Sequence, residues 1–90
     1  MDLHQKVVVS PQVIARQLGE ELVILDLASG TYFGLDAVGT RVWQLLSEGN
    51  DPAEACELMV AEFDVSREEL ERDILALLSE LSTRQLIGPA

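Results

Sequence analysis

The chain has little of what catalysis, metal binding and disulfide formation require. Its 90 residues include one histidine, His4, and one cysteine, Cys56, and they carry six basic against sixteen acidic side chains. A single cysteine excludes an intrachain disulfide, which fits a reducing compartment. No apolar run approaches the roughly 18 residues of a membrane-spanning helix, and the N-terminus lacks the apolar core of a signal peptide. We therefore expect a soluble, cytoplasmic protein.

No arrangement of reactive side chains predicts an active site. A Ser-His-acid triad would have to use His4, close to the chain end. Cys56 falls on the apolar stripe of a predicted helix, where a buried structural thiol is typical. The acids of residues 67–73 have the spacing of a solvated helix face, and the glycines form no phosphate-binding loop. The expectation is a protein that is not an enzyme and uses no metal or cofactor.

The charge is strongly acidic and unevenly distributed. The formal net charge is −10. Residues 1–50 carry six acids against three bases, whereas residues 51–90 carry ten against three. Such a surface repels phosphate backbones and anionic lipid, so neither nucleic acid nor a membrane is an expected partner. It favours basic or neutral partners, and it also serves solubility.

What is present is enough apolar material, 48% of residues, for one small domain over residues 1–90. The first part of the chain predicts strands. Residues 6–9, "KVVV", are rich in β-branched valine, and residues 12–18 continue their path after a bend at Ser10-Pro11. The nearly continuous apolar run 22–27 is typical of a central strand, and a short turn leads to a return strand over 31–35.

The apolar period then changes to that of helices. Asp36 is a predicted N-cap, and Gly49 is a predicted C-cap of the first helix. Residues 51–54 and the pair Ser66 and Glu69 predict capping boxes for a second helix and for a third over about 67–84. The predicted core positions are Val38, Val42, Leu45 and Leu46, then Ala53, Cys56, Met59, Val60 and Phe63, then Leu70, Ile74, Leu77, Leu78 and Leu81, with Leu86 and Ile87 folding back.

This order predicts an α+β domain resembling a winged helix-turn-helix, with a small antiparallel three-stranded sheet followed by three helices. A DNA-reading winged helix needs a basic recognition helix, but the third helix carries more acids than bases. The strand 31–35 is expected at the sheet edge with unpaired N–H and C=O groups. Such an edge can accept an extended peptide by strand addition, or it can be covered by a second copy of the chain.

A long segment of the sequence resembles the PqqD-like family. Residues 22–88 follow that family's order: a strand pair, a Gly-x-Tyr-x-x-Leu-Asn/Asp motif, a first helix ending in glycine, a short second helix and an acid-rich third helix. In this chain the motif is "GTYFGLD", residues 30–36. The matching positions are Gly30, Tyr32, Leu35, Asp36, Gly39, Trp43, Leu45, Leu46, Gly49, Phe63, Val65, Leu70, Ile74, Leu77, Leu81, Leu86 and Ile87.

The resemblance implies a RiPP recognition element, a domain that binds the leader segment of a ribosomally made precursor peptide. It implies that the leader adds as a strand along residues 31–35, in a groove with the third helix. Freestanding chains of this length are most similar to the leader-binding protein of lasso-peptide clusters, which works beside a separate leader peptidase or other modifying enzymes. Their leaders commonly carry a Tyr-x-x-Pro-x-Leu pattern. The chain would be a monomer or a weak homodimer.

On that arrangement, strand alternation places Phe33 and Leu35 with Thr31 on the face toward the helices. Asp73 flanks the apolar stripe of the third helix and is expected to accept a hydrogen bond or a basic group from the leader. Leu25 and Leu27 are expected to extend the pocket around Phe33. The predicted peptide-binding residues are Leu25, Leu27, Thr31, Tyr32, Phe33, Gly34, Leu35, Leu70, Asp73, Ile74 and Leu77.

Two alternatives stay open. One is a PqqD-type peptide chaperone of pyrroloquinoline quinone biosynthesis. Quinone-pathway members usually have a Pro-Glu-like pair where this chain has "YFGLD", so this alternative ranks second. The other is a non-catalytic winged-helix protein that works through an interface or through dimerisation at the same edge strand.

Overall fold

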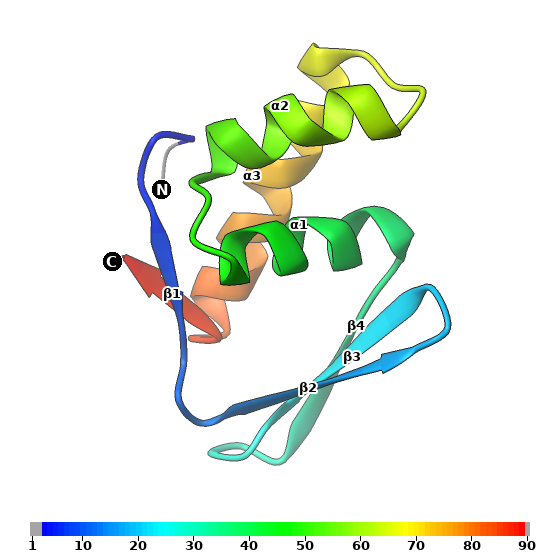
Figure 1. Ribbon diagram of the computed structural model, residues 1–90. Helices are drawn as coiled ribbons and strands as arrows, with labels where there is room; N and C mark the ends of the chain where they lie inside the picture. Colours follow the sequence, from blue (N-terminus) through cyan, green and yellow to red (C-terminus); the bar gives the residue numbers. More distant parts are fainter. Residues whose placement is uncertain (1–2, 90) are drawn as a thin grey trace.

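Figure 1 shows the computed structural model of the chain, which describes residues 3–89. The strands lead and the helices follow, as predicted, so the α+β class is confirmed. The elements are β1 (Val7–Val9), β2 (Val13–Leu18), β3 (Glu21–Asp26), β4 (Thr31–Leu35), α1 (Ala37–Ser47), α2 (Pro52–Glu62), α3 (Arg67–Thr83) and β5 (Ile87–Pro89).

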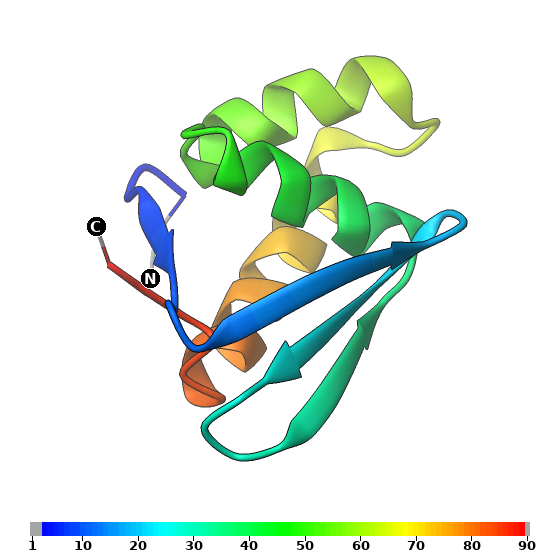
Figure 2. The ribbon, with the colours of Figure 1, turned by 60° about the horizontal axis from the view of Figure 1, so that its bottom comes forward.

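The main sheet is antiparallel with the strand order β2-β3-β4, so the apolar run of β3 is central, as predicted. Figure 2 shows the helices packed over one face of this sheet. Leu22 and Ile24 of β3 face the helices and are 5% and 0% exposed. Pairing of Leu22 with Leu35 and of Ile24 with Phe33 puts those two β4 side chains on the same inner face.

The first strand does not continue into this sheet. β1 pairs with β5 as a separate antiparallel ribbon in which Val7 lies opposite Pro89 and Val9 opposite Ile87. The Ser10 N–H donates to the Leu86 carbonyl at 2.9 Å, which holds the chain ends together before the turn into β2. The sequence placed residues 6–9 and 12–18 on one bent path, and that part of the prediction is wrong. The folding back of Leu86 and Ile87 is confirmed, because they are 2% and 5% exposed.

Local capping groups start each helix where the sequence indicates. Asp36 accepts the Gly39 N–H at 2.8 Å, and Asp51 and Glu54 form a reciprocal capping box at 2.7 and 2.8 Å. Ser66 accepts the Glu69 N–H at 3.2 Å, which is the Ser66 half of the predicted box. α1 ends one residue earlier than predicted: Glu48 is its C-cap, and Gly49 follows with φ at +99°.

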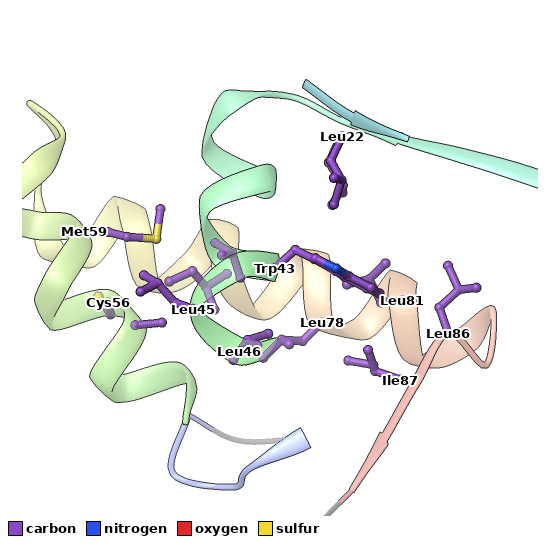
Figure 3. Packing of buried hydrophobic residues seen from close by; sticks show 14 of the residues in the cluster. Leu22, Trp43, Leu45, Leu46, Cys56, Met59, Leu78, Leu81, Leu86 and Ile87 are labelled. Atoms are coloured by element: carbon purple, nitrogen blue, oxygen red, sulfur yellow. The ribbon is translucent and has the colours of Figure 1, made fainter. Parts of the chain in front are cut away.

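The core lies where the three helices meet the inner face of the sheet, and Figure 3 shows part of it. Most predicted core positions are buried. In α2 the buried positions are Ala55, Cys56 and Met59, while Ala53 is only half-buried. Burial raises the pKa of the Cys56 thiol, as expected of a structural cysteine. Within residues 3–89, no helix has the length and apolarity needed to cross a membrane.

Candidate peptide-binding groove

A groove of about 700 Å³ lies between β4, α3 and the start of α1. The inner face of β4 contributes Phe33 and Leu35 to it. α3 contributes Asp73, Leu77 and Glu80, which stand on one helical face at spacings of three and four residues. The full lining is Glu21, Phe33, Gly34, Leu35, Asp36, Val38, Gly39, Val42, Asp73, Ile74, Ala76, Leu77 and Glu80.

The first turn of α1 closes one end of the groove at close range to β4. A Cβ atom at Gly39 would lie 3.2 and 3.3 Å from side-chain atoms of Leu35, which is closer than ordinary van der Waals contact, so a side chain there would require Leu35 to shift. Asp36 caps the helix beside it, which ties its carboxylate to the Gly39 N–H. The "LDAVG" segment therefore fixes the position of α1 against the edge strand.

The open edge of β4 follows from the pairing of the sheet. The Leu27 N–H donates to the Gln12 carbonyl at 2.8 Å, so the odd-numbered residues of β3 bond to β2 and the even-numbered ones to β4. Their β4 partners are Thr31, Phe33 and Leu35. The N–H and C=O groups of Tyr32 and Gly34 therefore point away from β3, to the side where the described residues place no further strand.

Six of the predicted site residues come together in the groove: Phe33, Gly34, Leu35, Asp73, Ile74 and Leu77. Leu70 is 1% exposed and belongs to the core instead. Thr31 lines a second pocket further along β4.

Leu25 and Leu27 do not extend the pocket around Phe33, and this part of the prediction is wrong. Leu25 pairs with Tyr32, and both side chains lie on the outer face of the sheet, where Tyr32 is 71% exposed. Leu27 follows the end of β3 and is 52% exposed. The hairpin register decides this, because the residue beside Phe33 on the inner face is Ile24.

Sequence reasoning also missed lining residues from other elements. Val38, Gly39 and Val42 come from α1, and Glu21 comes from the start of β3. A signal for α1 is present in the sequence at Gly39, which has no side chain and lets α1 approach Leu35 of β4 closely. Glu21 could be found only from the register, since Leu22 pairs with Leu35.

The groove combines an apolar floor with an acidic rim. Its charged lining residues are Glu21, Asp36, Asp73 and Glu80, and no basic side chain of residues 3–89 joins them. Asp73 is exposed on α3 beside half-buried Leu77. An extended peptide in this groove would meet apolar surface below and carboxylates at the sides, which suits a segment with apolar anchors and basic neighbours.

A second pocket of about 350 Å³ lies at the Thr31 end of β4 and shares Phe33 with the groove. Its lining includes Ile24, Asp26, Thr31, Arg84 and Leu86. The Arg84 guanidinium lies over the Phe33 ring, 4.8 Å from its centre. The two hollows therefore run along the whole inner side of β4, with Phe33 between them.

The described part of the chain holds no group of three or more His, Cys, Asp or Glu side chains that could bind a metal ion. The groove instead offers what an extended peptide needs: backbone donors and acceptors along one side and apolar surface beside them.

Comparison with protein families gives a match between residues 21–87 and the family described as coenzyme PQQ synthesis protein D, PqqD. The chain belongs to the PqqD family. The matched residues include both sides of the groove, from β3 and β4 through α3. The resemblance stated from the sequence is thereby confirmed. Among curated proteins, no sequence matches the chain.

Two solved structures are similar to this PqqD-family chain over nearly its whole length. One is TbiB1 in complex with the TbiA(beta) leader peptide, with 42% identity, a TM-score of 0.84 and coverage of 89% of this chain and 93% of that one. The other is lasso peptide synthetase B1 complexed with the leader peptide, with 30% identity, a TM-score of 0.85 and coverage of 93% and 99%. Both neighbours are complexes with leader peptides.

Proposed function

We propose that this PqqD-family protein, as a single domain over residues 1–90, binds the leader segment of a lasso-peptide precursor and has no catalytic activity of its own. The observation that carries the proposal is the unpaired edge of β4 beside an apolar-floored groove. Both structural neighbours are leader-peptide complexes, and the lasso peptide synthetase B1 complex supports a lasso precursor over a quinone precursor. The chain presents the precursor to a leader peptidase or another modifying enzyme.

The leader adds as a strand to β4. Its backbone bonds to the outward N–H and C=O groups of Tyr32 and Gly34, which together offer two donors and two acceptors. Alternate leader side chains then point to the inner face, where Leu35 and Leu77 receive apolar anchors. Backbone pairing supplies affinity that depends little on sequence, and the groove supplies the selection.

The acidic rim adds a charge preference. Asp73 stands on the groove side of α3 and receives a hydrogen bond or a basic group from the leader. Ordering an extended peptide opposes binding, so the net affinity should be moderate. We expect a dissociation constant in the micromolar range or below, which corresponds to a binding free energy of about −8 kcal/mol.

The deciding experiment is a titration of the chain against a fluorescein-labelled leader peptide of the precursor encoded beside its gene, followed by fluorescence anisotropy. Saturable binding that weakens when the leader's Tyr, Pro or Leu is replaced by alanine supports the proposal. Absence of binding at tens of micromolar, together with self-association in sedimentation velocity, would instead support an interaction protein that dimerises through β4.

Asp73→Asn tests the rim in the same assay. Glu68→Gln is the matched control, because it also removes one carboxylate from an exposed site on α3 and does not line the groove. We expect Asp73→Asn to weaken binding severalfold and Glu68→Gln to leave it nearly unchanged, as an exposed charge pair predicts. Equal effects of the two substitutions would exclude a direct contact by Asp73.

A further inference from the structure

Arg84 lies on the inner side of β4, beside Phe33. It follows the last turn of α3, and its guanidinium lies across Phe33, the residue common to the groove and the second pocket. Among the described residues, it is the one base that lines either hollow. The carboxylates lining the two hollows are Glu21, Asp26, Asp36, Asp73 and Glu80.

The guanidinium is held loosely enough to take another partner. Its side chain is 47% exposed, and its ion pair with Glu80 is long at 3.5 Å. A guanidinium has five N–H donors, so this contact leaves most of them for other acceptors. Asp26, the other charge in the second pocket, is engaged in its own turn, where it accepts the Ala28 N–H at 3.1 Å and the Ser29 hydroxyl at 2.9 Å.

The pairing of β4 specifies which leader residue reaches Arg84. With the outward groups of Tyr32 and Gly34 bonded to an antiparallel strand, the leader residue opposite Phe33 occupies a non-hydrogen-bonded position. Side chains at such positions are closest across the strands and point to the same face. That leader side chain therefore lies beside the Phe33 ring and within reach of the Arg84 guanidinium that covers this ring.

We propose that Arg84 is a specificity-determining residue, which selects an acidic side chain at the leader position opposite Phe33. The inference rests on the proposed leader binding and names the chemistry of one leader position. A carboxylate there meets a planar fork of N–H donors, the geometry that guanidinium groups pair with best. A basic side chain there meets a like charge. At neighbouring inward leader positions the preference reverses, and a basic side chain is favoured over an acidic one, because carboxylates line the groove.

The test is a position scan of the fluorescein-labelled leader peptide, with each residue replaced in turn by Glu, Lys and Gln. Each peptide is titrated against the unmodified protein, Arg84→Glu and Arg84→Gln. Arg72→Glu is the matched control, because it makes the same charge change on an exposed α3 residue that lines neither hollow. Far-ultraviolet circular dichroism checks that each variant is folded.

We expect one leader position at which the unmodified protein prefers Glu over Lys by about three- to tenfold, the range of a partly exposed ion pair. Arg84→Glu should reverse that preference at that position, and Arg72→Glu should shift all positions alike. The inference is overturned if no position prefers Glu, if Arg72→Glu reverses the preference too, or if Arg84→Gln weakens all peptides equally. That last result would mean that Arg84 only supports the Phe33 ring.

The scan also separates this inference from the proposed function. If the unmodified protein does not bind the unsubstituted leader, leader binding itself is refuted. If it binds that leader but shows no position-specific preference for Glu, only the role of Arg84 is refuted. Because the scan of the unmodified protein needs no substitution in the chain, an unfolded Arg84 variant would not prevent a decision.

Discussion

Gly34 combines an outward-facing backbone with open space around its α-carbon. A Cβ atom added there would have no heavy atom of another element within 4 Å, so Gly34→Ala should fold normally and keep the N–H. Proline at the same position removes that N–H, which the pairing with β3 does not use. We expect Gly34→Pro to weaken leader binding about fivefold to tenfold, which corresponds to one lost hydrogen bond of about 1 kcal/mol.

Fluorescence anisotropy measures the effect, with Gly34→Ala as the control and thermal unfolding as the check on the fold. Gly34→Ala should bind within about twofold of the unmodified protein, since it changes no hydrogen bond. A loss shared equally by both variants would point to crowding at this position and contradict a role for the N–H.

Individual residues could be predicted from the sequence where one helix decides their position. The family resemblance implies a groove beside the third helix, and helical spacing then predicts Asp73, Ile74 and Leu77 as lining residues, which the structure brings together. Leu25 was misplaced because its face depends on which residue it pairs with across the hairpin. A shift of register by one residue exchanges the two faces of a strand, and composition carries little information about register.

At the scale of elements, β4 has two kinds of amide. The N–H groups of Phe33 and Leu35 bond to β3, whereas those of Tyr32 and Gly34 face the open edge. In the free protein we expect fast hydrogen exchange at Tyr32 and Gly34 and slow exchange at Phe33. Saturation with leader peptide should slow exchange at Tyr32 and Gly34 most, because strand addition pairs their N–H groups.

Hydrogen exchange followed by NMR resolves these amides one by one. The amide of Phe33 is the internal control, since its partner is already present without the leader. Protection of Tyr32 and Gly34 in the free protein would indicate that a second copy covers the edge. Protection spread evenly over β4 on leader binding would indicate general stiffening of the domain and contradict strand addition.

The elements themselves were largely predictable, because their signals are local. Caps at Asp36, Asp51 and Ser66 start the helices at the expected residues. The pairing of β1 with β5 was not predicted, since it joins the two ends of the chain and leaves no mark in either segment. For the same reason the N-terminal segment was assigned to the main sheet. Local chemistry determines which elements form, and long-range pairing determines which of them meet.

At the scale of the whole molecule, two ion pairs connect the helices. Arg41 of α1 bonds to both carboxylate oxygens of Glu62 in α2 at 2.8 and 2.9 Å, and Arg67 of α3 pairs with Glu57 of α2. The hydrogen bond from Arg41 lowers the pKa of Glu62, and that from Arg67 lowers the pKa of Glu57. Both carboxylates therefore bind protons more weakly in the folded state than in the unfolded chain.

A carboxylate with a lowered folded pKa stabilises the fold above its unfolded pKa, about 4.5 here, and loses this contribution as the pH falls through the folded value. We expect Arg41→Gln to lower the urea midpoint at pH 7, and the difference from the unmodified protein to disappear in acid below the folded pKa of Glu62. Arg16→Gln removes the same charge from an exposed residue of β2 that forms no ion pair within residues 3–89, and it serves as the control. A difference that persists unchanged in acid would mean that Arg41 acts through packing.

Under the proposed function, the net charge of −10 should affect leader binding as well as solubility. Carboxylates around the groove attract a basic leader, and salt screens this attraction over a Debye length of about 10 Å at 0.1 M. Raising the salt from about 50 mM to about 500 mM should therefore weaken binding severalfold for a leader that carries Lys or Arg. A leader with those residues replaced by Gln should bind more weakly at low salt and respond little to added salt, since its backbone pairing and apolar anchors remain. If the unmodified leader bound equally well across this range, the acidic surface would serve solubility alone, and selection would rest on the groove floor and the edge of β4.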